Sequence, residues 1–448
     1  LPLGAFAEGS TLPELVMGTN GWPTCSDGTK GDGWEYSGGT LTLEFGEFDF
    51  TYADPTTKKT QANVAVQCAI VIKTPATITG GTFAGSVTNN NIISDGTFKD
   101  NVKNNIGGKI TGGNFAADKT VTNSGTIEGD GTFNGEVVNL NTIENGTFKG
   151  KVGNNSLING GKFQNTCSVT NYGSGIIHNG TFDGAVTNND GGHIEKGTFN
   201  GNVTNDDNGT IDNGTFNGDV TNDTTGTIFG GTFASDKKVE NKGTIAGAID
   251  SNGTFNGTVT NSGTIKDGKF NGNVTNYSSG TISGGTFACS VENEGTNATI
   301  KNGTFNATVT NKGGTISGGI FNGEVTNDNR GEIFGTGTFN GTVSNIQGII
   351  RGGTFNGDVI NFEKISDGTF ASDKKVENKG TIRNGKFNGD VTNDTTGTIF
   401  GGTFASDKKV ENKGTITEYG TFAGTVINND GGIISGGTFQ STSSVENK

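Results

Sequence analysis

A phenylalanine with a glycine two positions before it returns about every 17 residues along most of this chain, from Phe83 to Phe439. Aligned on this phenylalanine, the sequence contains 22 repeats. A valine follows four or six residues later, and an isoleucine six to nine residues after the valine. A repeat of this length cannot bury its apolar side chains alone, so neighbouring repeats have to stack. The sequence therefore predicts one elongated array rather than several globular domains.

Polar residues flank each of the three apolar anchors, an alternation that predicts short strands with one face inward. No helical stripe of apolar residues persists, and the 80 glycines disfavour helices throughout. The predicted fold is all-β: a single-stranded parallel β-solenoid (β-helix) with three short strands in each of about 22 coils. Strict hexapeptide spacing, the mark of left-handed β-helices, is absent, which favours a right-handed coil.

Two positions never vary. The residue two before the anchor phenylalanine is glycine in all 22 repeats, which predicts a positive φ or a close backbone approach at a corner. The residue two after the anchor valine is asparagine in all 22 repeats. An inward ladder of amides, each bonded to the next coil, explains this better than a surface turn does. Representative members of the predicted asparagine and phenylalanine ladders are Asn89, Asn104, Asn222, Asn241, Asn393, Asn412, Phe216, Phe233, Phe387 and Phe404.

Charge and hydropathy argue against two classes of function, nucleic-acid binding and membrane spanning. The net charge of −14 and the absence of a concentrated basic segment argue against nucleic acid as a partner. The longest nearly apolar run, "VAVQCAIVI", is too short to span a bilayer, so no transmembrane segment is predicted.

The two ends differ from the repeats. Residues 1–7 resemble the remnant of a secretory signal peptide with an Ala-x-Ala cleavage site, which predicts export. Residues 8–75 are predicted to form an N-terminal β cap over the first coil, and residues 76–448 to form the solenoid array. The array stops directly after an Asn-ladder position, and we expect the natural chain to continue.

The predicted cap contains two further features. Cys25 and Cys68 are a candidate disulfide, which an exported protein permits. Trp22, Trp34 and Tyr36 form either part of the cap core or a platform on which a sugar ring stacks, and the cap core is favoured.

No catalytic site, metal site or cofactor is predicted. The two histidines, His178 and His193, are expected in corner turns of successive coils without an acidic partner. No Cys/His cluster, P-loop or calcium-binding nonapeptide is present. Threonine precedes the anchor phenylalanine in 17 of the 22 repeats, and ice binding by such threonine columns is one hypothesis. The β-propensity of threonine explains the same column without any function.

The segment "GWEYSGGTLTL" followed by tandem "GGTFNGDVTN…GTI" resembles secreted or wall-attached repeat proteins of Gram-positive gut bacteria, the pectin-lyase-like β-helix adhesins. The resemblance implies a location at the bacterial surface but carries over no catalytic residue. The leading hypothesis is a non-enzymatic, extracellular structural or adhesive protein: a rigid rod or stalk that forms fibres with itself or contacts surface glycans or proteins. The alternatives are a glycan-binding or polysaccharide-degrading β-helix protein and, third, an ice-binding protein.

Overall fold

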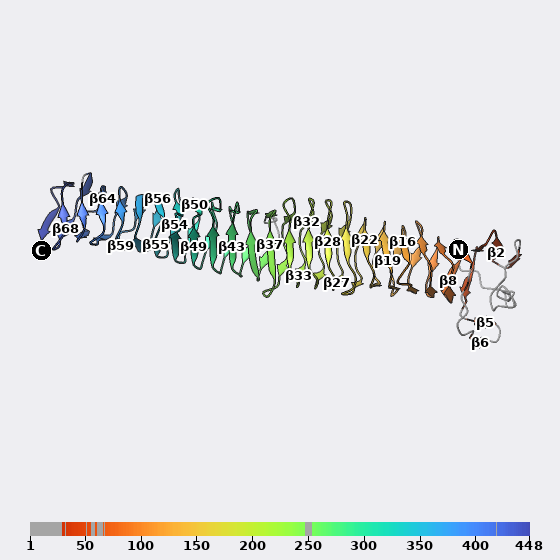
Figure 1. The fold of residues 1–448 in the computed structure, drawn as a ribbon. Coiled ribbons are helices and arrows are strands. Elements are labelled where there is room, and N and C mark those ends of the chain that lie inside the picture. The colour runs from red at the N-terminus through yellow and green to blue at the C-terminus, as the bar shows by residue number, and fades with distance from the viewer. Residues whose placement is uncertain are drawn as a thin grey trace. The chain divides into compact units, whose positions relative to one another are not determined.

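The computed structural model describes residues 29–31, 33–50, 52–54, 59–60, 66, 68–246, 253–417 and 419–448. This part of the chain contains β-strands and no α-helix. It divides into two compact units, Leu1–Gly218 (unit 1) and Asp219–Lys448 (unit 2). Within each unit the chain winds into coils that stack on one another, as Figure 1 shows. The predicted parallel β-solenoid is confirmed.

Each coil contributes three short strands, as predicted. In one coil of unit 2 these are β48 (Thr304–Phe305), β49 (Val309–Lys312) and β50 (Thr315–Ile316), which carry the phenylalanine, valine and isoleucine anchors. All three strands pair in parallel with the next coil and without offset: Phe305 lies opposite Phe321 and Val309 opposite Val325. Because the register is zero, identical residues form continuous columns.

Each unit contains the same three kinds of column. In unit 1 the phenylalanine strands run from β9 (Thr82–Phe83) to β33 (Thr215–Phe216), the valine strands from β10 (Val87–Asn89) to β31 (Val203–Asn205), and the isoleucine strands from β8 (Thr77–Gly80) to β32 (Thr210–Ile211). In unit 2 they run from β36 (Thr232–Phe233) to β70 (Thr438–Phe439), from β34 (Val220–Asn222) to β71 (Ser444–Asn447), and from β35 (Thr227–Ile228) to β69 (Ile433–Ile434). Two longer strands, β56 (Ile349–Phe355) and β58 (Lys364–Phe370), join the isoleucine and phenylalanine positions of their coils.

The phenylalanine column is a stack of parallel rings. In unit 1 the Phe115 and Phe133 ring centroids lie 4.6 Å apart at an interplanar angle of 2°, and in unit 2 Phe370 and Phe387 lie 4.6 Å apart at 4°. The spacing follows from the distance between hydrogen-bonded strands, which brings each ring onto the next. Nearly all of these rings, with the adjacent valine and isoleucine columns, are buried.

The predicted asparagine ladder is confirmed inside the same core. Asn311 accepts a hydrogen bond from Nδ2 of Asn293 (2.7 Å) and donates one to Oδ1 of Asn327 (2.8 Å). Its Nδ2 also donates to the carbonyl oxygen of Gly314 at 2.9 Å, within the turn of its own coil. Twenty of the ladder asparagines have no exposed surface. The ladder thus satisfies corner carbonyl groups that water does not reach.

The prediction for the invariant glycine is also confirmed. Eighteen of the 22 glycines have a positive φ, for example 133° at Gly96. At the other four positions, Gly131, Gly253, Gly337 and Gly420, close approach excludes a side chain: an added Cβ at Gly420 would lie 2.7 Å from the Phe422 ring. In each of these four repeats the glycine faces the edge of its own phenylalanine.

Ahead of the first repeat, the chain forms an antiparallel meander of β1 (Thr29–Gly31), β2 (Trp34–Ser37) and β3 (Thr40–Leu43). Strand β3 then pairs in parallel with β7 (Ala69–Ile72), which pairs in parallel with β10. Strand β4 (Glu47–Asp49) pairs with β8 in the isoleucine column, and a separate antiparallel pair joins β5 (Tyr52–Asp54) and β6 (Lys59–Thr60). The parallel register therefore extends into the region predicted as a cap.

This extension replaces the ladder residues by apolar ones. Ile72 lies opposite Asn89, the first ladder asparagine, so an aliphatic side chain takes the place of an amide. Phe50 meets the Phe83 ring edge-on, with centroids 5.5 Å apart and an interplanar angle of 87°. The parallel ring stack thus begins only at Phe83. The boundary at residue 75 stays a prediction, and the predicted signal remnant lies outside the described residues.

Candidate binding surfaces

A second asparagine ladder runs along the outside of the coils, one residue after the anchor phenylalanine. In unit 2, Nδ2 of Asn322, Asn340 and Asn356 each donates to Oδ1 of the asparagine one coil earlier, over 2.8, 2.8 and 2.9 Å, so the run begins at Asn306. All four side chains are exposed. Asparagine occupies this position in ten of the 22 repeats, but no hydrogen bonds along this column are predicted from the sequence. An alignment of the repeats, examined column by column, could have indicated this outer ladder.

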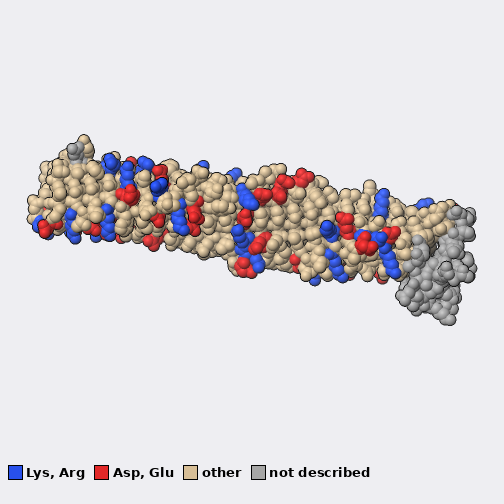
Figure 2. Space-filling model, in the orientation of Figure 1, with Lys and Arg blue, Asp and Glu red and all other residues tan. Residues whose placement is uncertain are grey.

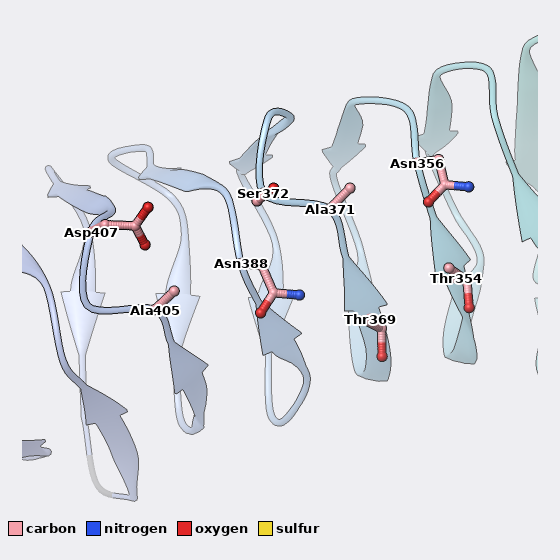
Figure 3. A pocket seen from close by; sticks show the side chains of 8 residues that line it. All are labelled: Thr354, Asn356, Thr369, Ala371, Ser372, Asn388, Ala405 and Asp407. Atoms are coloured by element: carbon pink, nitrogen blue, oxygen red, sulfur yellow. The ribbon is translucent and has the colours of Figure 1, made fainter.

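The outer ladder stops where alanine replaces asparagine. Ala371 follows Asn356 in the column, Asn388 follows Ala371, and Ala405 follows Asn388. Figure 3 shows the two short alanine side chains alternating with the longer asparagine side chains. Among the described residues, no side chain donates to Oδ1 of Asn356, and the side-chain amide of Asn388 makes no hydrogen bond.

An open groove of about 510 Å³ lies at this place in unit 2. Its lining comprises the four members of the column just described, with the hydroxyl groups of Thr354, Thr369 and Ser372 and the carboxylate of Asp407. The lining is thus made of hydroxyls, amides, methyl groups and one carboxylate.

Alternating corner lengths create the groove. Six-residue corners ("FASDKKV") follow Phe370 and Phe404, and a four-residue corner ("FNGDV") lies between them. The short corner packs tightly, because a Cβ at Gly389 would lie 1.9 Å from the carbonyl oxygen of Lys374 in the preceding long corner. The long corner is held by the backbone N–H of Lys375, which donates to Oδ1 of Asp358 at 2.9 Å.

Charges around the groove compensate one another. Asp407 is 73% exposed and forms an ion pair with Lys408 at 3.4 Å, and Asp373 pairs with Lys374 at 3.4 Å. On the face in Figure 2, basic and acidic side chains lie next to each other rather than in separate fields. An exposed ion pair of this kind contributes little to stability, but it weakens the electrostatic field at the groove where a ligand would bind.

The expectation that both histidines lack acidic partners is wrong. His178 Nδ1 lies 2.5 Å from Oε2 of Glu195, and His193 Nε2 lies 2.8 Å from Oδ2 of Asp212. His193 also lies in a strand, β29 (His193–Ile194), rather than in a corner. The pairs form because one coil brings residues 17 and 19 positions apart together on the surface of unit 1. Among the described residues, no group of three His, Cys, Asp or Glu side chains is placed to hold a metal ion.

The cysteines fall into different environments. Cys25 lies outside the described residues, so its pairing with Cys68 stays a prediction. Cys167 is buried, and this burial raises the pKa of its thiol to about 12. Cys289 is half-buried, and its Sγ contacts the carbonyl oxygen of Asn271.

The predicted aromatic platform is described only in part. Trp34 and Tyr36 are half-buried, lie on the same face of β2 and are paired in register with Leu43 and Leu41, which are buried. Residues directly opposite in an antiparallel pair point to the same side of the sheet, so both aromatic side chains face the core side. Trp22 lies outside the described residues, and the platform stays a prediction.

In the part of the chain that the structure describes, no helix has the length and apolar character needed to cross a bilayer. Comparison of the sequence and the structure with protein-family models, curated proteins and solved structures gives no match.

Proposed function

We propose that this protein is a non-enzymatic structural or adhesive protein, exported to a bacterial surface, whose β-solenoid serves as a stiff stalk. The observation that carries the proposal is where the invariant residues lie. In each unit the repeated glycine, phenylalanine, valine, isoleucine and asparagine close corners or fill the core, coil after coil.

Stiffness follows from this packing. Each coil bonds to its neighbours through three strands, one ring stack and one amide ladder, so bending would stretch the contacts on one side of the stack and compress those on the other. A scaffold whose invariant residues all make it stiff is suited to holding a binding surface away from the cell. Export is supported by the Ala-x-Ala pattern at residues 5–7 and by the resemblance to surface repeat proteins.

The test combines localisation with imaging. The protein should be found in the surface fraction of the producing cells and be degraded by protease added to intact cells. Negative-stain electron microscopy of the full-length protein should show stiff particles, alone or joined into fibres. A cytoplasmic location, or particles that bend freely between coils, would overturn the proposal.

Ice binding remains a hypothesis with less support. The threonine column before the anchor phenylalanine is interrupted in unit 2 by Lys269, Ile320 and Lys386, all exposed. A flat array of matched hydroxyl and methyl groups is therefore broken. Thermal hysteresis of the purified protein tests this directly.

A further inference from the structure

We propose that the groove of unit 2, between the corners that follow Phe355 and Phe404, binds a neutral oligosaccharide. The inference deepens the adhesive part of the proposed function. It rests on that function only for the statement that binding takes place at a bacterial surface. Binding itself is a property of the groove and is tested in solution.

The chemistry of the lining identifies the class of ligand. Hydroxyl and amide groups both donate and accept hydrogen bonds, which suits a ligand that carries many hydroxyl groups. No lining side chain is basic, and the one carboxylate, Asp407, already has Lys408 as partner. An anionic polysaccharide or a phosphate ester would therefore meet no cation in the groove.

The spacing of the amides suits a sugar chain. Asn356 and Asn388 belong to coils two steps apart, which places them about 10 Å from each other along the stack. An extended disaccharide covers such a distance. Ala371, between them, leaves space that a third asparagine side chain would fill. The side-chain amide groups that bond to one another elsewhere in the outer ladder can here bond to a ligand.

An extended peptide is the weaker candidate. Peptides that bind β-structure usually add to a free strand edge or place side chains in apolar pockets. Here β56, β58 and β61 (Lys386–Phe387) are all paired to a neighbouring coil on both sides, and the groove lies on their outward face.

Substitution of a single alanine tests the groove. Ala371→Asn restores the residue found at this position in ten repeats, so it fills the groove and is expected to fold. Ala288→Asn makes the same change in the same column of unit 2, outside the groove, and serves as the matched control. Asn388→Ala is a second groove variant that removes an amide without adding bulk.

The probes are neutral oligosaccharides of two to six glucose, galactose, mannose or N-acetylglucosamine units, measured by calorimetry on the full-length protein. At least one series should bind, Ala371→Asn and Asn388→Ala should weaken that binding tenfold or more, and Ala288→Asn should leave it unchanged. No binding by any series, binding only of acidic polysaccharides, or equal binding by all variants would overturn the inference. None of these results changes the localisation or the stiffness on which the structural role depends, so the two proposals fail separately.

Discussion

Burial determines how much an amide ladder contributes to the stability of the fold. Two asparagines of unit 2 allow a direct comparison. Asn311 belongs to the buried ladder and Asn322 to the exposed one, in successive coils. Each accepts one amide–amide hydrogen bond and donates another. Replacing either by alanine removes one accepted and one donated amide–amide hydrogen bond, and Asn311→Ala also removes the bond to the carbonyl oxygen of Gly314.

The two replacements should nevertheless differ greatly in cost. Asn311→Ala leaves Oδ1 of Asn327 in the core without the donor that bonds it now, whereas the carbonyl oxygen of Gly314 keeps the backbone N–H of Glu332 as a donor. An unsatisfied buried group costs about 1–3 kcal/mol, so Asn311→Ala should destabilise its coil by about that amount. In Asn322→Ala water replaces the lost partners, and the change should stay within about 0.5 kcal/mol.

Hydrogen exchange read by mass spectrometry is the suitable assay, because a long repeat array does not unfold in two states. In Asn311→Ala, the amides of the coils that contain Asn293 and Asn327 should exchange roughly 5- to 150-fold faster, while distant coils keep the wild-type rate. In Asn322→Ala, no coil should exchange more than about threefold faster. Equal effects of the two substitutions would refute the reasoning, since burial would then not determine the value of the ladder.

The other predictions use the same local readout or simple chemistry. Phe305→Ala should leave a cavity between two stacked rings and cost about 3–5 kcal/mol, seen as faster exchange in neighbouring coils and contradicted by wild-type rates there. Gly96→Ala should lower unit 1 stability more than Gly107→Ala: both have positive φ, but only at Gly96 would the new Cβ meet a ring, at 2.9 Å. At pH 8 the pKa of about 12 leaves only about one Cys167 thiol in 10⁴ ionised, so iodoacetamide should modify Cys289 in the folded protein and Cys167 only in denaturant. Equal labelling of both would contradict the assigned burial.

The columns of the core were predictable because their period survives every variation in corner length. Asn311 and Phe305 each stand at an invariant position, and zero register turns an invariant position into a column. The groove was not predictable in this way. It depends on which long and short corners lie next to each other. The repeat pattern does not show that an alanine such as Ala371, between two asparagines of the outer column, opens a groove.

Two other features differ in whether an alignment of the repeats could have predicted them. The pairing of His178 with Glu195 joins two positions that both follow the isoleucine anchor, so column alignment would have identified it. The coil before the first repeat would have escaped any such alignment. Ile72 stands there in place of the ladder asparagine, and the glycine–phenylalanine signature is absent beside it.

Zero register between coils also bears on how such a chain changes over generations. Residues 214–245 and 385–416 differ at one position only, Thr215 against Lys386, and their anchor phenylalanines are ten repeats apart. Unequal crossing-over between the two gene segments would delete or duplicate ten repeats without leaving a partial one. Because any coil presents the same phenylalanine, valine, isoleucine and asparagine positions to its neighbour, the recombinant protein would keep every column in step. Length is therefore a heritable property that selection can adjust in large steps without first having to repair the fold.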